Sequence, residues 1–246
     1  MEHNSEKRVC LFTGGSGQLG TTFCRMFSAY YDIAAVYRNH PPQPPSQLSW
    51  FIDPLMPASE LPENQNAIFA IQADLSVEEE LDRIVDETLT RFGRIDVLVN
   101  AAAYSCWSPM LDGEQLFDSF HMQFDLNAYV PLRLSALVAE RYWQNNSKDN
   151  KRFNRSVVNI SSTAGVYIYR GLGQSVYSAS KAALNFLTKH AADELGVIGV
   201  RANAVAPTSF PDLVSIESVA EGIRTLIENR ATGSILVIDV NGESWL

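Results

Sequence analysis

Cysteine and histidine are scarce in this sequence of 246 residues, and no long hydrophobic run occurs in it. The cysteines are three, an odd number scattered along the chain, so they favour reduced thiols over a disulfide framework and indicate a cytoplasmic protein. The four histidines do not stand at metal-ligand spacing with the cysteines, and we expect no metal site. The cysteines are Cys10, Cys24 and Cys106.

Positive charge is also scarce. The chain has 19 Lys and Arg against 28 Asp and Glu, a net charge of −9, and no basic cluster offsets it. That balance argues against a nucleic-acid surface. No apolar run is long enough for a membrane span, and the first eight residues, MEHNSEKR, lack the apolar core of a signal peptide. We therefore expect a cytoplasmic protein that binds neither nucleic acid nor membrane.

What the sequence does contain is an alternation of apolar runs with stretches that predict helices. This order predicts an α/β fold with a seven-stranded, parallel, doubly wound sheet and helices on both faces, formed by one domain over residues 1–246. Residues 39–66 hold seven prolines, so a loop is expected there in place of a helix. The predicted strands are 9–13, 33–37, 67–72, 96–99, 156–160, 200–205 and 234–240; the predicted helices are 18–30, 76–92, 113–143, 177–195 and 215–229.

A glycine-rich turn joins the first strand to the first helix, with the sequence TGGSGQLG over 13–20. Glycine lets the backbone approach a pyrophosphate, and a helix N-terminus favours negative charge. Strand, turn and helix in this order favour dinucleotide binding over an ordinary flexible turn. Arg38 ends the second strand, where an acid would bind ribose hydroxyls. Because Arg suits a 2′-phosphate, NADP is favoured over NAD, the alternative being a surface Arg.

Small or hydroxylated residues follow three later strands. They are Asn100-Ala101-Ala102-Ala103, Ser161-Ser162-Thr163 and Ala206-Pro207-Thr208. Ligands of open α/β sheets bind at the carboxyl ends of the strands, so these residues are candidates for contacting one. Ser and Thr are also ordinary turn residues, which is the alternative.

Tyr177 and Lys181 stand four residues apart on a predicted helix and therefore share one face. A nearby ammonium favours the phenolate, which makes the Tyr a better proton donor near neutral pH. The alternative is a solvated face with one packed ring. Pro131 lies inside the predicted helix 113–143, and it has no N–H to bond the carbonyl of Asn127. That carbonyl is expected to be free to hold a water, the alternative being a tolerated kink.

The ordered set Thr13–Gly20, Asp74, Asn100, Asn127, Ser162, Tyr177 and Lys181 resembles the short-chain dehydrogenase/reductase family in its compact form, over residues 7–242. The resemblance implies a Rossmann-like fold. It also implies Tyr177 as the acid/base, Lys181 lowering its pKa, Ser162 orienting the substrate oxygen and Asn127 holding a relay water. The implied cofactor-binding residues, besides Tyr177 and Lys181, are Gly14, Ser16, Gln18, Leu19, Arg38, Asp74, Leu75, Asn100, Ala101, Ala102, Pro207 and Thr208.

The sequence departs from the family pattern in four places. Gln18 replaces the middle glycine of the turn, Asn-Asn-Ala-Gly is replaced by Asn-Ala-Ala-Ala at 100–103, and Thr208 replaces a glycine. The segment from Pro207 to Ser215 is also shorter than the mobile segment that the family carries there. We expect an open site, or one that another subunit completes.

These features predict an NADPH-dependent reductase of a carbonyl on a small, apolar or aromatic molecule. Alternatives are a reductase of imines or activated double bonds, and an NADP(H) sensor or scaffold without turnover. The predicted helices 113–143 and 177–195 resemble the family's dimer-forming pair, so a homodimer or a homotetramer is expected, the latter through Trp245 and Leu246. The alternative is that these residues pack on their own subunit. The predicted pocket residues are Cys106, Trp107, 167–172 and Phe210.

Overall fold

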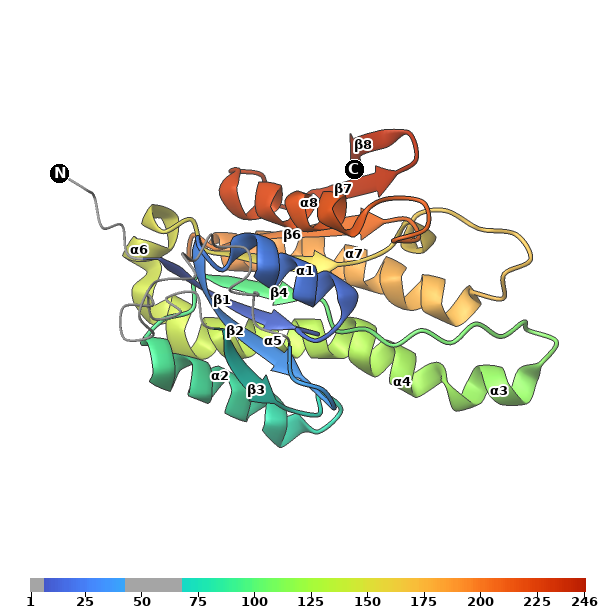
Figure 1. Ribbon diagram of the computed structural model, residues 1–246, viewed down its shortest axis with the longest axis horizontal. Coiled ribbons are helices and arrows are strands. Elements are labelled where there is room, and N and C mark those ends of the chain that lie inside the picture. The colour runs from blue at the N-terminus through green and yellow to red at the C-terminus, as the bar shows by residue number, and fades with distance from the viewer. Residues whose placement is uncertain (1–6, 43–67) are drawn as a thin grey trace, which may run out of the picture.

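The computed structural model describes residues 7–42 and 68–246. One twisted sheet runs through the middle of the molecule, with helices on both sides (Figure 1). The loop predicted over 39–66 falls mostly on residues 43–67, which lie outside the described residues.

The sheet has eight strands in the order β3-β2-β1-β4-β5-β6-β7-β8. The strand order reverses between β1 and β4. The connections that follow these two neighbouring strands therefore run in opposite directions and leave a crevice at their carboxyl ends. The strands are β1 Arg8–Thr13, β2 Tyr31–Tyr37, β3 Phe69–Gln72, β4 Val97–Asn100, β5 Ser156–Ile160, β6 Arg201–Pro207, β7 Ile235–Asp239 and β8 Gly242–Trp245.

The prediction of seven parallel strands is correct for β1 to β7, but an eighth strand was missed. β8 returns antiparallel to β7 after a turn of two residues, and Ile235 and Leu246 exchange backbone hydrogen bonds at its end. Gly242 has a φ of 108°, a backbone conformation that favours glycine. All four residues of β8 are exposed, so the sequence has no alternation of apolar and polar residues that would predict this strand.

Two cores lie on opposite faces of the sheet. Phe23 of α1 (Gln18–Phe27) and Ile223 of α8 (Ile216–Glu228) pack with the strands on one face. Ile84 of α2 (Glu78–Phe92), Leu134 of α5 (Val130–Val138) and Ala192 of α7 (Ser175–Gly196) pack on the other. Because both faces are covered, β4, β5 and β6 are buried at every residue and lack the alternation of a half-exposed strand.

The region 113–143 is helical as predicted, but it divides into several segments and is not one regular helix. Pro131 has no N–H for the regular α-helical ladder, and a π-helical turn lies directly before the helix that contains it. A second π-helical turn follows that helix. The segments are α3 Gly113–Asp118, α4 Phe120–Phe124, η3 Asp125–Tyr129, α5 Val130–Val138 and η4 Ala139–Trp143.

The start of α2 also differs from the prediction of residue 76. The helix begins at Glu78, and the Ser76 hydroxyl donates to Asp74 Oδ1 at 2.7 Å instead of capping the helix. After η5 (Gln144–Asn146) comes the short helix α6 (Ser147–Arg152). Later, Ser215 caps α8, accepting from the amide of Ser218 at 3.1 Å.

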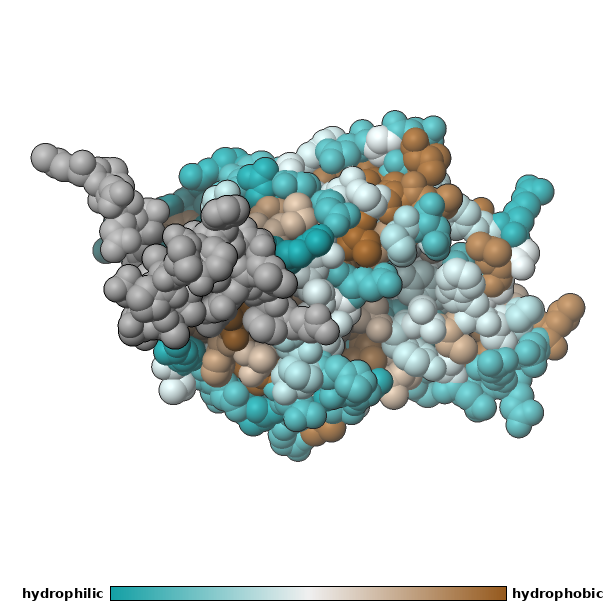
Figure 2. Space-filling model, viewed as in Figure 1, coloured by the Kyte–Doolittle hydropathy of each residue, from teal (hydrophilic) through white to brown (hydrophobic). Residues whose placement is uncertain are grey.

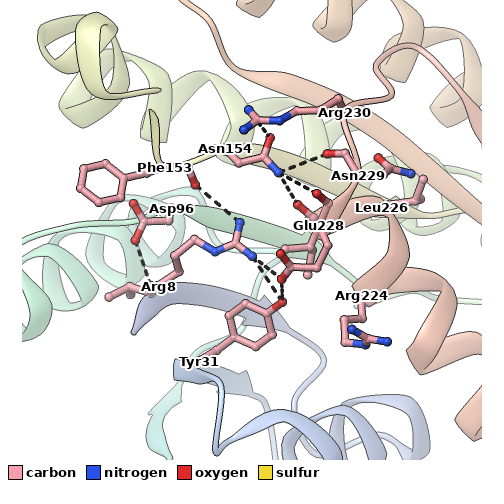
Figure 3. A network of polar contacts seen from close by, with 12 residues as sticks. Arg8, Tyr31, Asp96, Phe153, Asn154, Arg224, Leu226, Glu228, Asn229 and Arg230 are labelled. Carbon is pink, nitrogen blue, oxygen red and sulfur yellow. Dashed lines mark hydrogen bonds and ion pairs between the residues drawn. The ribbon is translucent and has the colours of Figure 1, made fainter. Parts of the chain in front are cut away.

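A polar network holds the C-terminal end of α8 near the amino ends of the strands (Figure 3). Asn154 Nδ2 donates to the carbonyls of Ile227, Glu228 and Asn229 at 3.0–3.1 Å. Asn154 Oδ1 accepts from Arg201 Nε at 2.8 Å. Beside it, Arg8 and Tyr31 both donate to the Glu228 carboxylate. The Asn154 contacts supply donors to carbonyls at the end of α8, where no further helical amide follows to bond them.

Candidate active site

Two hollows open where the strands end at their carboxyl side. One, of about 290 Å³, lies beyond β1, β2, β3 and β4, and is lined by parts of the glycine-rich turn, Arg38, Asp74 and Ala102. The other, of about 270 Å³, lies beyond β5 and β6, and is lined by Ser162 and Tyr177 among others. The structure thus divides the predicted site residues into two groups.

The glycine-rich turn is tightly packed, and two of its glycines leave no room for a side chain. A Cβ at Gly20 would lie 2.4 Å from the carbonyl oxygen of Gly14, and one at Gly15 would lie 2.8 Å from the Cβ of Ala35. Gly14 has a φ of 74°, which favours glycine. Gly17 is the N-cap of α1 and makes no side-chain cap, so the first amides of the helix have no capping side chain.

Gln18 and Leu19 follow at the start of α1 but neither lines the hollow. The Gln18 side chain is exposed, and the Leu19 side chain packs in the core with 6% of its surface exposed. Their contribution to a bound phosphate would therefore come from backbone amides at the positive end of the helix dipole.

The far end of the same hollow carries one cation and one anion. Arg38 is exposed and forms no ion pair with any other residue in the described part of the chain, whereas Asp74 Oδ1 accepts from the amide of Ser76 at 3.0 Å and from its hydroxyl. These hydrogen bonds, and to a smaller degree the Arg38 charge, lower the pKa of Asp74, so its carboxylate stays ionised. Leu75 lines the hollow beside it, and Ser16 lies on the turn opposite.

The backbone after β4 is fixed by one hydroxyl. Thr13 Oγ1 accepts from the amides of Ala101 and Ala102, at 3.0 and 3.1 Å. Asn100 was predicted to contact the cofactor, but its side chain is buried beneath the crevice, where Nδ2 donates to Asn159 Oδ1 at 2.8 Å. The structure gives Asn100 a place in the sheet core and leaves the two alanines facing the hollow.

Ser162 and Tyr177 come together in the wall of the second hollow. Ser162 caps the 3₁₀ turn η6 (Thr163–Gly165), accepting from the amide of Ala164 at 3.1 Å, and Tyr177 lies in the first turn of α7. Burial raises the pKa of Tyr177, and the neighbouring Ser162 hydroxyl lowers it by a smaller amount. The net pKa of Tyr177 is therefore raised, opposite to the predicted effect of Lys181.

Lys181 explains that difference. Its side chain is buried with 2% exposed, and Nζ donates to the carbonyl of Ile160 at 2.8 Å. Nζ lies 5.9 Å from the centre of the Tyr177 ring. Burial lowers the pKa of Lys181 to about 7, so the ammonium is only partly populated at neutral pH and stabilises a phenolate weakly.

Asn127 lies in the π-helical turn η3, and its side chain is hydrogen-bonded to other groups of the protein. Nδ2 donates to the carbonyl of Tyr104 at 2.8 Å and to Ser180 Oγ at 3.0 Å, and Oδ1 accepts from the amide of Tyr104 at 2.9 Å. Any direct role for Asn127 in chemistry must therefore use its backbone carbonyl, as the position of Pro131 predicts.

The short segment after β6 forms one wall of the second hollow. Thr208 donates its amide to Ile238, and a turn held by the carbonyl of Ser209 brings Phe210 and Leu213 to the hollow. Of the predicted pocket residues, Cys106 does not line it, while Trp107, Tyr169, Leu172 and Phe210 do. Hydrophobic residues are exposed at the end of the molecule from which α3 and the loop before α7 project (Figure 2).

Sequence reasoning missed three residues of this hollow, Gln174, Ser209 and Leu213. Gln174 stands three residues before Tyr177 and is the N-cap of α7. This three-residue spacing could have identified Gln174, since residues three apart at the start of a helix lie on the same side of it.

Other site types find little support in the described ranges 7–42 and 68–246. No cluster of three metal-ligating side chains occurs among these residues. None of their helices combines the length and the apolar character that a bilayer span requires.

Comparison with known proteins agrees with the fold. The family model described as short chain dehydrogenase matches residues 8–212. An uncharacterized oxidoreductase of Schizosaccharomyces pombe is 33% identical over 202 residues, 82% of this chain and 67% of the relative. L-xylulose reductase of Mesocricetus auratus is 35% identical over 182 residues, covering 63% of this chain and 70% of the relative.

A solved short chain dehydrogenase from Mycobacterium avium superposes with a TM-score of 0.77, at 23% identity, over 98% of this chain and 85% of its own. At that identity the likeness concerns the fold. Taken with the family model, it places the molecule in a class: the chain belongs to the short chain dehydrogenase family, whose members are oxidoreductases that bind NAD(P)(H).

Proposed function

We propose that the protein is an NADPH-dependent reductase that transfers hydride to the carbonyl of a small, apolar or aromatic substrate. The observation that supports this most directly is that Ser162 and Tyr177 lie together in the wall of an uncharged cleft, with Lys181 buried behind them. Two hydroxyls that meet in one wall suit a carbonyl oxygen, because both can donate to it as negative charge develops.

The first hollow suits the dinucleotide. Its glycine-rich turn brings bare backbone to the hollow, with Gly14 lining it and Gly17 leaving the first amides of α1 uncapped. Arg38 offers a cation for a 2′-phosphate, while Asp74 and Leu75 suit the adenine. The bound nicotinamide would supply the hydride, with Pro207 and Thr208 beside it.

The residues of the second hollow would perform the acid/base part of the reaction. Tyr177 donates its proton to the substrate oxygen while Ser162 holds that oxygen in place. Lys181, with a pKa of about 7, exchanges a proton near neutral pH and would return one towards Tyr177. The Asn127 carbonyl would hold the water that links Lys181 to solvent.

The cleft suits an apolar or aromatic substrate because much of its wall is apolar. Trp107, Leu172, Phe210 and Leu213 line it, and Trp107 is 54% exposed at its rim. The L-xylulose reductase similarity supports a reaction at a carbonyl, since that relative is named for the reduction of a ketose.

We further propose one domain that acts as a homodimer or a homotetramer in the cytoplasm. Tyr129 and Leu132 around the start of α5, and Phe186 on α7, expose 43%, 45% and 66% of their surfaces. A second copy would bury such apolar groups. Trp245 and Leu246 are about half exposed at the sheet edge and suit a further contact.

A panel of ketones, quinones, pterins and imines, each incubated with NADPH or NADH, tests the proposal through cofactor oxidation at 340 nm, roughly the nicotinamide absorbance maximum. We expect turnover with ketones and preference for NADPH. Turnover restricted to imines or activated double bonds would support the alternative chemistry on the same scaffold. Cofactor binding without turnover of any compound would contradict the reductase proposal and favour the sensor.

A further inference from the structure

Gln174 lies in the wall of the second hollow. Its backbone carbonyl accepts from the amide of Ser178 at 2.7 Å, which starts α7. Its side-chain amide oxygen is buried and has no hydrogen-bond partner among residues 7–42 and 68–246. A buried polar atom without a partner costs about 1–3 kcal/mol, so an added partner at this amide is favourable.

The other polar side chains around it are mostly occupied. Ser161 Oγ donates to the Lys181 carbonyl, Thr163 Oγ1 to the Pro207 carbonyl, and Tyr169 Oη to Thr163 Oγ1. Ser209 Oγ donates to Asp212. These bonds hold the wall in place and leave the Gln174 amide free to meet a ligand beside the Ser162–Tyr177 pair.

The position of Gln174 limits where on a ligand its partner can lie. It stands three residues before Tyr177 at the start of the same helix. Residues at that spacing have Cβ atoms roughly 5–6 Å apart. A substrate whose carbonyl oxygen meets Tyr177 therefore brings the neighbouring carbon atoms, and not a remote end, towards the Gln174 amide.

The chemistry of the cleft limits what that partner can be. No charged side chain lines the cleft in the described part of the chain, so a carboxylate or a phosphate on the substrate would lose its hydration without a counter-charge. A hydroxyl is neutral, and it can donate to the amide oxygen or accept from the amide nitrogen. It therefore fits either orientation of the Gln174 amide.

We infer that Gln174 is a substrate-binding residue that selects ketones with a hydroxyl on a carbon next to the carbonyl. This inference rests on the proposed carbonyl reduction, because Tyr177 fixes where the carbonyl lies. It adds a polar requirement to a cleft that is otherwise largely apolar. Compounds that satisfy both are hydroxy ketones with an apolar or aromatic remainder.

The test compares α-hydroxyacetophenone with acetophenone, which differ by that hydroxyl. For each, kcat/KM with NADPH is measured in the wild type, in Gln174→Leu and in Gln174→Met. The hydroxyl also activates the carbonyl chemically, so the informative quantity is how the preference for the hydroxy ketone changes between proteins. We expect both variants to lose about tenfold of that preference, as for one hydrogen bond to a buried polar group.

Gln144→Leu is the matched control, because it makes the same change at an exposed residue of η5 outside the cleft. It should keep the wild-type preference. An equal preference for the hydroxy ketone in the wild type and in both Gln174 variants would overturn the inference. Turnover of either ketone would in that case still support the proposed function.

A binding measurement separates the two ideas when turnover is absent. Isothermal titration calorimetry of α-hydroxyacetophenone into each protein, with and without NADP⁺, should show roughly tenfold weaker binding in both Gln174 variants. Binding of that kind without reduction of either ketone would contradict the reductase and leave the Gln174 site supported. Absence of both binding and reduction would overturn both.

Discussion

Lys181 donates a hydrogen bond from Nζ to the backbone oxygen of Ile160 at 2.8 Å, and this contact ties α7 to the carboxyl end of β5. The amine is held inside the protein, behind the ring of Tyr177. Burial lowers its pKa from 10.5 to about 7. Protonation of one buried amine is therefore coupled both to stability and to the proposed proton transfer.

The pH dependence of stability should reveal this amine. Below pH 7 Lys181 is charged in both the folded and the unfolded chain, and the full cost of burying the charge is present. Between pH 7 and 10.5 the unfolded chain binds the proton more strongly, so this group makes the free energy of unfolding rise with pH. Relative to Lys181→Met, the wild type should gain stability by at most about 1.4 kcal/mol per pH unit.

Urea denaturation between pH 6.5 and 9.5 measures the difference between the two proteins. Lys189→Met, at an exposed position of the same helix, is the control and should show no such trend. A wild-type-minus-Lys181→Met difference that stays flat over this range would contradict a buried amine of lowered pKa.

Tyr177→Phe should abolish most turnover while leaving cofactor binding intact. The change removes the proposed proton donor, and general acid catalysis contributes roughly 10²–10⁴-fold to a rate. For a ketone that the wild type reduces, we expect kcat to fall by at least about 10²-fold. The Kd for NADPH, measured by fluorescence titration, should change by less than about threefold.

Tyr169→Phe removes another hydroxyl from the same cleft wall, one that donates to Thr163 Oγ1 at 2.9 Å. It should reduce kcat by much less than Tyr177→Phe. Similar losses in the two variants would assign the effect to packing of the wall and not to proton transfer.

Arg38→Leu tests the preference between the two nicotinamide cofactors. Loss of a charge-assisted contact with a 2′-phosphate costs about 1.5–3 kcal/mol, so the KM for NADPH should rise roughly tenfold to a hundredfold. The KM for NADH should change little, because NADH lacks that phosphate. Steady-state kinetics with both cofactors measures this.

Arg25→Leu is a suitable control, because Arg25 is an exposed Arg of α1 paired with Glu217 at 2.8 Å. It should leave the ratio of the two KM values as in the wild type. Parallel changes for NADPH and NADH in Arg38→Leu would rule out the 2′-phosphate contact.

Asn154→Ala and Asn154→Gly should separate two sources of stability at the end of α8. Asn154 has a φ of 53°, which a non-glycine residue adopts at a cost, and its amide donates to three carbonyls. Both variants lose these hydrogen bonds, so the free energy of unfolding should fall by about 2 kcal/mol or more. Glycine tolerates the backbone, so Asn154→Gly should be roughly 1 kcal/mol more stable than Asn154→Ala.

Thermal or urea unfolding of both variants measures this. Asn146→Ala, which removes a single contact from Asn146 to the carbonyl of Tyr142, is the comparison and should cost less. If Asn154→Ala were as stable as Asn154→Gly, the backbone strain at this position would be negligible.

The sequence predicted the sheet well because burial leaves a plain pattern. β5 was predicted with both of its bounds, since its apolar run is fully buried and hydroxylated residues follow it. β8 was missed because it is exposed throughout and its pairing with β7 depends on a turn rather than on an apolar pattern. The predicted start of α2 at residue 76 was wrong because Ser76 bonds the nearby Asp74 carboxylate and the helix begins at Glu78.

The residues of the candidate site could be proposed from the sequence, but their electrostatics could not. The family resemblance implied Ser162 and Tyr177, and both line the same hollow in the structure. Spacing could not show that Lys181 is buried, and burial decides the direction of both pKa shifts. Asn100 was assigned to the hollow because it ends a strand, although its side chain turns into the core.

The π-helical turn η3 has a consequence for how this region tolerates changes of length. A π turn accommodates one residue more than an α turn, and each α-helical residue adds roughly 100° of rotation. Deleting one residue from Asp125–Tyr129 would allow an unbroken α-helix and would leave the buried faces of α4 and α5 in phase, because the π turn holds its extra residue within about one revolution. Such a deletion would therefore change the backbone around Asn127 while the rest of the helical arm keeps its packing.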